Sequence, residues 1–527
     1  MPVKLRSIAL VLLMVLLPGA ALESQVKYLR GFRLGSSQGS SPHIPSNGIS
    51  HMAVHDSTIW LGTSKGVAKS SDGTRSWDNF QGVAAFHYNG IYSLAVLGDT
   101  VWAAMGYDTQ LDQSSVQTGG GYAYTTDRGA TWDSARQTMD SRGDSILSYG
   151  VNDSLWVLPV VVPQQNVTFG ISLRPGVVWI ASWASGLRRS TDRGHSWQRT
   201  LLPTDNMNTL SPSDTLYTYL PADTARRVKI FPRLDPRNNN NFLAFSVLAV
   251  DDDTIWCGTA GGVNKSTDKG KSWVKFSHQN QASPILGNWV IAIAEQRLPG
   301  VNRIWTTNWK ANDPDEQYGV SYTENGGVSW KNILHGIKAY DFAFRDSIAY
   351  IASDSGVYRT ADGGLSFIKV SNITYPAHGE VILTPEADCV DHLGDTILVG
   401  TPDGFATTVD DSSHQFGSSW KILRTALPGS YAYPNPFSPS LDVAVRIHYN
   451  SGSAGGSMRT VGIEIFDFGM NRVRTLISGA ARAPGRDFDE TWDGRTDDGR
   501  LAANGVYFYR VRIDNDAPFF GKILLIQ

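Results

Sequence analysis

Alternating apolar and polar residues form short runs along most of the chain, and turn-forming residues bound each run. One string recurs: two apolar residues, any residue, Gly or Ala, Thr or Ser, a short loop, then Gly and an apolar residue. This string predicts two strands joined by a tight turn. Its copies are IWLGTSKGV (59–67), VWAAM with GGY (101–122), VWIASWASGL (178–187), IWCGTAGGV (255–263), IWTTNW with YGV (304–320), YIASDSGV (350–357) and ILVGTPDGF (397–405).

An eight-residue motif, Ser/Thr-x-Asp-x-Gly-x-Ser/Thr-Trp, follows these strings. An Asp in a bend accepts hydrogen bonds from backbone N–H groups, Gly permits a positive φ, and a closing Trp buries a large apolar area. The motif therefore predicts a hairpin turn, and we expect its acidic residue to be structural instead of catalytic or metal-binding. Intact copies centre on Asp127, Asp192 and Asp268, and degenerate copies on Asp72, Asn325, Asp362 and, stretched by an insertion, Asp410.

The alternating run before each string, such as IYSLAVLGD before Val101, brings each unit of about 40 to 75 residues to four short strands. Four strands per repeat are typical of a β-propeller blade. The predicted fold is all-β, with a seven-bladed propeller over residues 47–427 that closes into a ring. The insertion at 203–241 is expected to lie over the face opposite the Asp motifs, with its NNNN run as a mobile polar loop.

The repeated motif resembles the Asp-box, or BNR, repeat of propellers found in sialidases, sortilin-type receptors, a photosystem assembly factor and xyloglucan-degrading hydrolases. The resemblance covers residues 47–427 and implies the propeller fold. Because these relatives include enzymes, receptors and assembly factors, the resemblance does not choose an activity.

The last hundred residues or so show a second pattern, in which Ile463, Ile465 and Phe466 near Val473 predict a half-buried hairpin. Its strings are YPNPFSPS (433–440), VGIEIFDFGMNRVRTL (461–476), WDGRTDDG (492–499) and NGVYFYRV (504–511). In this order they resemble the immunoglobulin-like modules of the flagellar hook-cap type and of type IX secretion sorting domains. The resemblance implies that residues 428–527 form a small β-sandwich read by an outer-membrane secretion machine. A passive adhesive sandwich is the alternative.

The first residues have the pattern of an export signal. Lys4 and Arg6 precede an apolar run at 7–17, and small residues at 18–21 suit cleavage after about Ala21. Residues 1–21 are therefore predicted to be a signal peptide, and residues 22–46 a lead-in to the propeller. The apolar run is too short to cross a hydrocarbon layer of about 30 Å. No transmembrane segment is expected in the mature chain, which should reach the cell surface or the medium through the periplasm.

Overall composition and charge give no support to several functions. The chain has 527 residues and a net charge of −3, so no basic excess supports binding to nucleic acid or to a membrane surface. The two cysteines, Cys257 and Cys389, lie in apolar strings and are expected to be buried and unpaired. The histidines are scattered, and HExxH, GxxxxGK and a plausible GxSxG elbow are absent from the sequence, so neither a metal nor a cofactor is expected.

Candidate site residues lie in loops that join the second to the third strand of a unit, or one unit to the next. Both kinds of loop share the face opposite the Asp motifs, which we call the loop face. Aromatic and histidine side chains there suit stacking on sugar rings or peptide side chains, although some could simply plug the channel. The candidates for ligand binding are Tyr107, Trp183, Trp309, His278, Trp289, Tyr375 and His378.

These features predict a secreted or cell-surface protein whose loop face recognises a glycan or an extracellular protein. The alternative is a glycoside hydrolase of sialidase or xyloglucanase type, and a scaffold without a ligand is a third possibility. A hydrolase would need two carboxyls about 5 to 10 Å apart beside a groove. The candidate catalytic residues are Asp108, Asp112, Asp313, Asp315 and Glu380. FPRL (231–234) is only a faint match to the arginine motif of sialidases, and it lies inside the insertion.

Overall fold

The computed structural model describes residues 40–87, 90–111, 114–216, 218–219, 229–230, 234–375, 380–425, 430–452, 458–516 and 518–527. These residues belong to one compact unit, Gln38–Gln527. The predicted signal peptide, most of the lead-in, residues 231–233 of FPRL, and the candidates Asp112 and His378 lie outside the described residues.

Seven antiparallel sheets organise the described residues before position 425, and each contains four strands that follow one another in sequence; sheet 4 has a fifth strand at its edge. Sheets 1 to 3 contain β1 (Ile49–His55), β2 (Thr58–Thr63), β3 (Gly66–Ser70) and β4 (Asp78–Asn79); β5 (Gly90–Leu97), β6 (Thr100–Leu111), β7 (Ser114–Thr125) and β8 (Asp133–Ala135); β11 (Thr168–Arg174), β12 (Val177–Ser182), β13 (Gly186–Ser190) and β14 (Gln198–Arg199). Sheets 4 and 5 contain β18 (Ala244–Ala249), β19 (Ile255–Thr259), β20 (Gly262–Ser266) and β21 (Trp273–Phe276); β22 (Trp289–Leu298), β23 (Val301–Trp309), β24 (Gly319–Thr323) and β25 (Lys331–Ile333). Sheets 6 and 7 contain β26 (Ala339–Arg345), β27 (Ile348–Ser353), β28 (Gly356–Thr360) and β29 (Ile368–Val370); β32 (Cys389–Leu393), β33 (Thr396–Thr401), β34 (Gly404–Val409) and β35 (Lys421–Leu423).

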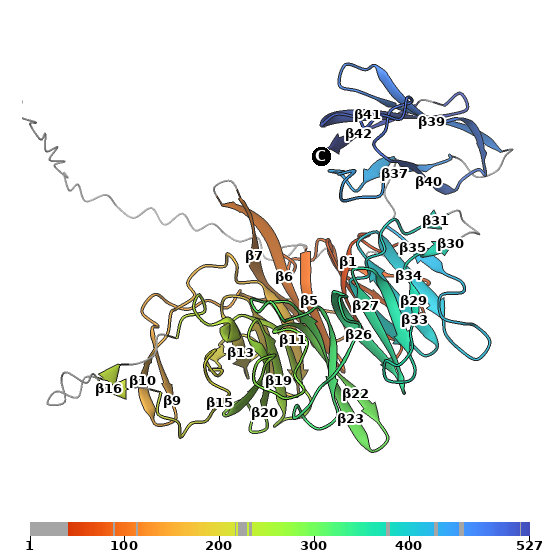
Figure 1. Cartoon of the computed structure of the whole chain (residues 1–527). Coiled ribbons are helices and arrows are strands. Elements are labelled where there is room, and N and C mark those ends of the chain that lie inside the picture. Colours follow the sequence, from red (N-terminus) through yellow and green to blue (C-terminus); the bar gives the residue numbers. More distant parts are fainter. Residues whose placement is uncertain are drawn as a thin grey trace, which may run out of the picture. The chain divides into compact units, whose positions relative to one another are not determined.

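The first strands of these sheets contact one another in cyclic order, from β1 through β5, β11, β18, β22, β26 and β32 and back to β1. Sheets that surround a common axis in this way form a β-propeller (Figure 1). Near the point of closure, Ile44 bridges to Thr425, whose N–H donates to Asn47. The predicted all-β fold is confirmed. Both cysteines are buried and unpaired.

Six of the seven motif residues hold the turn between the third and fourth strands of a sheet. Asp268 is representative: its Oδ1 accepts the N–H groups of Lys271 and Ser272, and its Oδ2 accepts the Ser272 hydroxyl at 2.6 Å. Asn325 makes the equivalent bonds to Ser329 with its side-chain amide. Equivalent bonds to the residue four positions on are made by Asp72, Asp127, Asp192 and Asp362.

Asp410 differs from the other motif residues. Its carboxylate accepts a hydrogen bond from Arg359 Nε at 2.6 Å and another from the Tyr350 hydroxyl, both in sheet 6. The inserted residues separate Asp410 from Ser419, and Asp411 instead accepts the N–H groups of the bend. The expectation that Asp410 pins a hairpin turn therefore does not hold, because the insertion replaces the short bend that an Asp side chain can span.

The aromatic residue that closes each motif packs on the preceding sheet. Trp132 contacts Trp60 of sheet 1, with ring centroids 6.1 Å apart, and Trp77 contacts Phe405 of sheet 7 at 5.6 Å. Trp197 and Trp330 contact Trp102 and Trp256 in the same way. The motif thus ties each sheet to its neighbour, and removing one such buried ring typically costs about 3 to 5 kcal/mol.

The insertion at 203–241 lies at the loop face only in part: Asp205 and Asn240 are beside Gly261 of the β19–β20 loop, and the middle of the insertion lies elsewhere. β15 (Thr209–Leu210) pairs with β21 and widens sheet 4 at its outer edge, and Leu210 packs into the core shared with Trp273. The NNNN run (238–241) ends in a 3-10 turn, η1 (Asn240–Phe242), and Asn241 is fully buried. The Asn241 side chain bonds to Thr259 and Asn264, so this end of the run is held in place and is not the mobile loop that the sequence predicted. Three further hairpins lie among the described residues before position 425: β9 (Ile146–Tyr149) with β10 (Asn152–Trp156), β16 (Thr218–Tyr219) with β17 (Lys229–Ile230), and β30 (Thr374–Tyr375) with β31 (Glu380–Val381).

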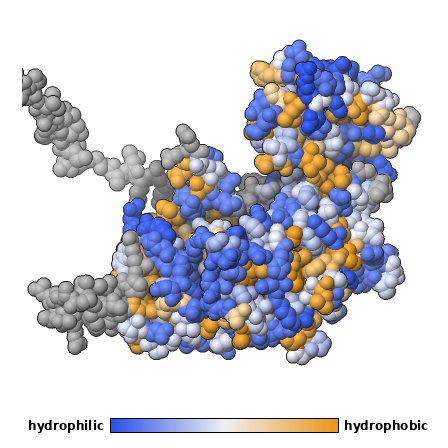
Figure 2. Space-filling model, in the orientation of Figure 1, coloured by the Kyte–Doolittle hydropathy of each residue, from blue (hydrophilic) through white to orange (hydrophobic). Residues whose placement is uncertain are grey.

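Residues 430–527 form two further sheets, which we call the C-terminal sandwich. Their strands are β36 (Tyr431–Tyr433), β37 (Val445–Asn450) and β40 (Asp487–Trp492) in one, and β39 (Arg472–Arg482), β38 (Arg459–Phe466), β41 (Gly505–Ile513) and β42 (Phe519–Leu525) in the other. Ile463, Ile465, Trp492 and Tyr509 meet in one buried core between them. On the face that Figure 2 shows, this part of the molecule carries both hydrophobic and hydrophilic residues.

Candidate ligand-binding face

Five aromatic side chains follow the loop-face end of sheets 2 to 5. Tyr92, Phe169, Phe245 and Trp289 lie near the starts of β5, β11, β18 and β22, and Trp183 follows β12. Successive ring centroids are 6.1 Å apart from Tyr92 to Phe169 and 6.1 Å from Phe169 to Phe245. Phe245 also contacts Trp183 at 5.0 Å and Trp289 at 5.6 Å. We call this set the aromatic arc; the sequence singled out Trp183 and Trp289 but missed the other three.

The aromatic arc borders a cavity of about 1040 Å³, which we call the central cavity. Tyr92 and Phe169 supply its aromatic wall, and Gln117, His51, Tyr340 and Asp388 contribute polar groups. Tyr431 and Tyr433 of the C-terminal sandwich line it as well. A cavity of this size, mostly apolar with a few converging polar groups, is typical of ligand sites.

The indoles of Trp183 and Trp289 are half-buried and meet edge to face, with centroids 5.8 Å apart. Among the described residues, neither indole N–H is paired with an acceptor, and neither is a buried orphan. Each ring therefore offers an apolar face together with a free donor, which is the combination that makes Trp effective in recognition.

Trp309 is held more firmly than the arc tryptophans. Its indole N–H donates to the Ala339 carbonyl at 3.0 Å, its ring lies 5.7 Å from that of Tyr340, and the Lys338 ammonium stands over it. These contacts explain Trp309 as a packing residue between sheets 5 and 6. Burial, reinforced by the nearby Glu386 carboxylate, raises the pKa of the Tyr340 hydroxyl.

Sheets 6 and 7 contribute three carboxyls at or beside their first strands. Burial raises the pKa of Asp341 to about 7, although its carboxylate accepts the Val390 N–H. Burial likewise raises the pKa of Asp391, which accepts the Val54 N–H, to about 7. Asp388, on the wall of the central cavity, reaches a similar pKa through burial and the charge of Glu386. Of these three carboxyls, Asp388 is the one on the wall of the central cavity, where Tyr340 of sheet 6 also lies.

Asp313 lines a second hollow, a polar groove of about 470 Å³ between sheets 4 and 5. His278 and Asp315 are not on its wall, although each is next in sequence to a residue that is, Gln279 and Glu316. Gln279 Nε2 donates to Asp313 Oδ2 at 3.1 Å and to Glu316 Oε1 at 3.2 Å, so these two carboxyls are near neighbours. Glu316 is only 2% exposed. Both of its oxygens are filled by hydrogen bonds from Asn288 and Ala311. Glu316 therefore stabilises the loop between β23 and β24.

The other predicted candidates are spread over the molecule. Asp108 is exposed on the extension of β6, where its charge adds to burial in raising the pKa of Tyr92. Tyr107 lies beside it, half-buried. Tyr375 lies opposite Glu380 in the β30–β31 hairpin and packs on the core of sheets 6 and 7. The candidate carboxyls Asp108, Asp313 and Glu380 thus belong to three separate places.

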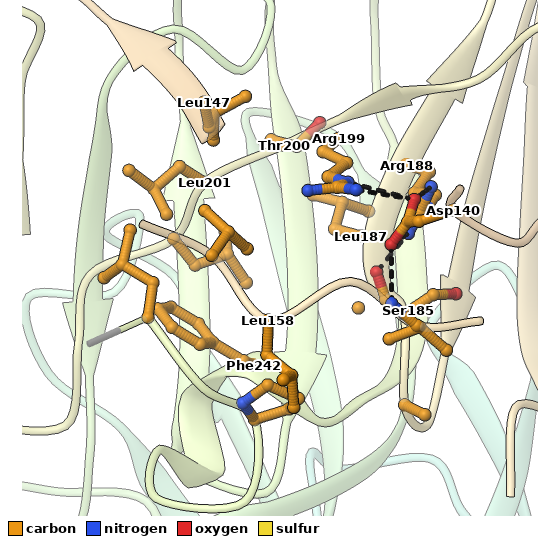
Figure 3. A pocket seen from close by; sticks show the side chains of 17 residues that line it. Asp140, Leu147, Leu158, Ser185, Leu187, Arg188, Arg199, Thr200, Leu201 and Phe242 are labelled. Atoms are coloured by element: carbon orange, nitrogen blue, oxygen red, sulfur yellow. Dashed lines mark hydrogen bonds and ion pairs between the residues drawn. The ribbon is translucent and has the colours of Figure 1, made fainter. Parts of the chain in front are cut away.

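A smaller cavity, of about 60 Å³, lies between sheet 3 and the insertion (Figure 3). Six leucines are among its lining residues, and the buried Asp140 carboxylate pairs with Arg188 at 2.8 Å and with Arg199 at 3.0 Å. Burial opposes ionisation of Asp140, but hydrogen bonds and charge from Arg188 outweigh it and lower the pKa. The cavity is too small for a ligand beyond a few waters.

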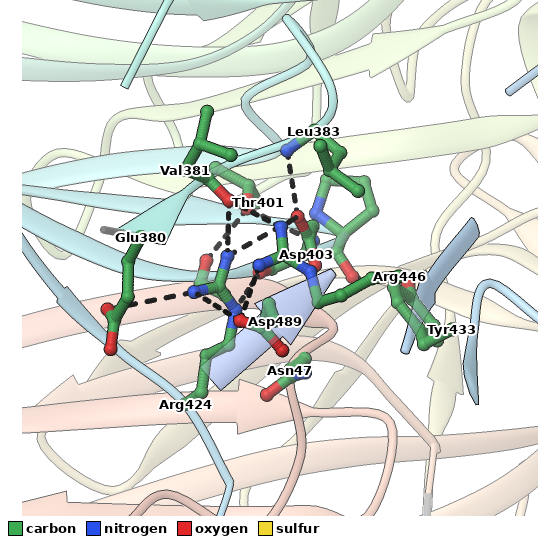
Figure 4. A network of polar contacts seen from close by, with 12 residues as sticks. Asn47, Glu380, Val381, Leu383, Thr401, Asp403, Arg424, Tyr433, Arg446 and Asp489 are labelled. Atoms are coloured by element: carbon green, nitrogen blue, oxygen red, sulfur yellow. Dashed lines mark hydrogen bonds and ion pairs between the residues drawn. The ribbon is translucent and has the colours of Figure 1, made fainter. Parts of the chain in front are cut away.

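An arginine network joins the C-terminal sandwich to sheet 7 (Figure 4). Arg446 of β37 is 0% exposed and pairs with Asp403 and Asp489, each at 2.7 Å, and it also donates to the Val381 carbonyl. Arg424 approaches Glu380 at 3.7 Å and Asp403 at 3.4 Å. Burial opposes the charge of Asp489, but His448 and the arginines lower its pKa to about 2. Glu380 therefore contributes to an ionic joint.

Among the described residues, no three His, Cys, Asp or Glu side chains are grouped as a metal site requires. Within the same part of the chain, no helix has the length and apolar character needed to span a membrane.

No family model matches the chain, and no curated protein matches it. Solved structures with a similar arrangement include PorZ, a bacterial surface component of the type-IX secretion system of Porphyromonas gingivalis, at 14% identity and a TM-score of 0.33; the match covers 90% of this chain and 64% of PorZ. YCF48 from Cyanidioschyzon merolae is 14% identical with a TM-score of 0.39, covering 69% of this chain and 96% of that one. An ancestral GH74 enzyme is 12% identical with a TM-score of 0.47, covering 92% and 62%. The chain spans less than two thirds of PorZ and of the enzyme, and the likeness assigns no activity.

Proposed function

We propose that the protein is a binding protein of the cell surface or the medium whose loop face recognises a glycan or an extracellular protein. The observation that carries this proposal is the aromatic arc beside the central cavity. Trp183 and Trp289 keep part of their faces and their N–H groups open there. Such rings bind the apolar faces of sugars or peptide side chains, and the N–H groups add directional hydrogen bonds.

We also propose that residues 1–21 direct export and that residues 428–527 act as a sorting domain read by outer-membrane secretion machinery. The four strings that carry this resemblance lie in strands and turns of one sandwich with a common core, which supports reading them as a single module. The Asp-box assignment of the propeller is part of the same proposal, and the turn bonds of Asp268 and its equivalents support it.

The hydrolase alternative has no observation in its favour. Asp313 and Glu316 are close together, but Glu316 is buried and its oxygens are occupied by the loop backbone and Asn288. Glu380 lies beside Arg424. A glycosidase needs one carboxyl to donate a proton and a second to attack or to activate water. Glu316 and Glu380 are engaged in the contacts just described and are not placed to do so.

The proposal is tested with the mature chain on a glycan array and on a panel of extracellular proteins. Trp183→Ala and Trp289→Ala should each weaken the strongest binding about tenfold or more, because a central aromatic contact is commonly worth 1.5 to 3 kcal/mol. Phe468→Ala, an exposed ring in the C-terminal sandwich, is the matched control and should leave that binding unchanged.

Binding that survives both tryptophan changes would reject the aromatic arc as the site. Turnover of a generic glycosidase substrate by the wild-type chain, lost in Asp313→Asn, would favour the hydrolase instead.

A further inference from the structure

The outer face of the sheet β39-β38-β41-β42 carries an unusual set of side chains. Residues at alternate positions of β38 and β41, such as Ile463 and Tyr509, point into the sandwich core. The positions between them therefore point outward, and register pairs Glu464 with Arg510 and Phe466 with Phe508. Pairing with β42 extends this face to Phe520, Lys522 and Leu524, and pairing with β39 extends it to Arg472.

Positive charge dominates this outer face. Arg510 and Arg512 contact Glu464 at 2.7 and 2.5 Å, and Arg472 approaches it at 3.6 Å, so three guanidinium groups share one carboxylate. Lys522 adds a fourth cation from β42 and is exposed. The chain as a whole carries a net charge of −3, which concealed this local excess at the level of composition.

Large apolar side chains near these cations are exposed to solvent. Phe468 is 77% exposed and Met470 is 53% exposed in the turn between β38 and β39, and Phe520 is 55% exposed opposite Arg510. Phe468 lies 6.3 Å from Phe508, and the Arg510 guanidinium stands over Phe466 at 5.0 Å. Exposed apolar groups clustered at such a face mark an interaction site.

We propose that this outer face docks the protein on an anionic lipid surface. Arginine and lysine attract phosphate-bearing headgroups, and phenylalanine and methionine side chains insert between them at the boundary of the acyl layer. An anionic polysaccharide would satisfy the cations, but it would leave Phe468, Met470 and Phe520 without an apolar partner. The inference goes beyond the proposed function, because it concerns the C-terminal sandwich and not the loop face.

The test uses the full mature chain and two vesicle preparations, one of phosphatidylcholine alone and one with a third of its lipid replaced by phosphatidylglycerol. The chain should co-sediment with the anionic vesicles only, and added salt should weaken the binding. Each basic side chain near an anionic surface contributes roughly fivefold in partitioning. Arg510→Gln with Arg512→Gln should therefore weaken binding about 25-fold, and Phe468→Ser should weaken it several-fold.

Two controls match these variants. Arg500→Gln removes an exposed cation from a turn of the sandwich, and Leu365→Ser removes an exposed apolar side chain from a propeller turn. Neither should alter vesicle binding, and Trp183→Ala should not either, which separates this inference from the loop-face proposal. Equal binding to both vesicles, binding unchanged in the double arginine variant, or binding to an anionic polysaccharide without binding to vesicles would overturn the inference.

Discussion

Asp388 shows how a single carboxyl on the axis of the propeller ties stability to pH. It lines the central cavity, and burial together with the charge of Glu386 raises its pKa to about 7. A raised carboxyl pKa means that the folded state favours the neutral form. The associated stabilisation is complete below the unfolded pKa of about 3.8 and is lost as the pH rises toward 7. Asp341 and Asp391 add to this dependence in the same direction.

Asp388→Asn should therefore stabilise the protein at pH 8 and have no effect near pH 4. Asn cannot ionise, so the variant avoids a buried charge that the wild type carries above pH 7. The expected gain is on the order of 1 kcal/mol, reduced from the full pKa shift because Asp388 keeps some contact with water. Urea unfolding at several pH values measures it.

The control for this experiment is Asp56→Asn, in the exposed turn after β1, where the change should not reproduce the gain at pH 8. A gain for Asp388→Asn that is the same at pH 4 and pH 8 would contradict the explanation by charge.

At the scale of a strand pair, the motif turn predicts graded costs for two substitutions of one residue. Asp268→Ala removes an acceptor that serves two backbone N–H groups and two hydroxyls, including that of Ser266. It should cost about 1 to 3 kcal/mol. Asp268→Asn should cost less than half as much, because Asn325 already holds the corresponding turn of sheet 5 through its amide. Thermal unfolding of the two variants compares them directly.

Asp410→Asn compares the two roles found among the motif residues, which are to hold a hairpin turn, as Asp268 does, and to pair with an arginine, as Asp410 does. Because Asp410 pairs with Arg359, replacing it with a neutral amide should be more costly than the same change at Asp268. Equal costs at both positions would show that the contacts of Asp410 contribute no more than an ordinary turn does.

Local pattern was enough to predict the strands and most of the turns, because each depends on neighbours in sequence. Strand alternation identified the runs that became β2 and β3, and the Asp and Trp positions identified the bends after β3. The pairing of β15 with β21 could not be predicted from the sequence, since a strand of two residues shows no alternation of apolar and polar positions. An insertion is also difficult to place when its partner strand lies about sixty residues ahead.

The candidate site was predictable only in part, for a similar reason. Trp183 and Trp289 stood out because they lie in loops, but Phe169 and Phe245 looked like ordinary strand residues. They become a surface only when the first strands of separate sheets meet around the axis. Glu380 was proposed as a catalytic acid, and its proximity to Arg424 became visible only once sheet 7 and the β30–β31 hairpin were brought together.

At the scale of the whole molecule, the arginine network is the contact on which the joint between sheet 7 and the C-terminal sandwich depends. Arg446 is fully buried and compensates two buried carboxylates, Asp403 and Asp489. Removing the guanidinium while the carboxylates remain leaves their charge without its main partner. Arg446→Met should therefore destabilise the full chain by about 3 to 5 kcal/mol.

A second substitution, at Asp403, tests whether this cost comes from the unpaired carboxylate charge. Arg446→Met combined with Asp403→Asn removes one of the two carboxylate charges that Arg446 compensates. The double variant should therefore recover part of the lost stability and be more stable than Arg446→Met alone. Arg500→Gln breaks the exposed pair with Asp498, where water screens both charges, and should cost less than 1 kcal/mol. Chemical unfolding of the four proteins gives the comparison. If the double variant lost more than Arg446→Met, packing of the arginine stem and not its charge would hold the two parts together.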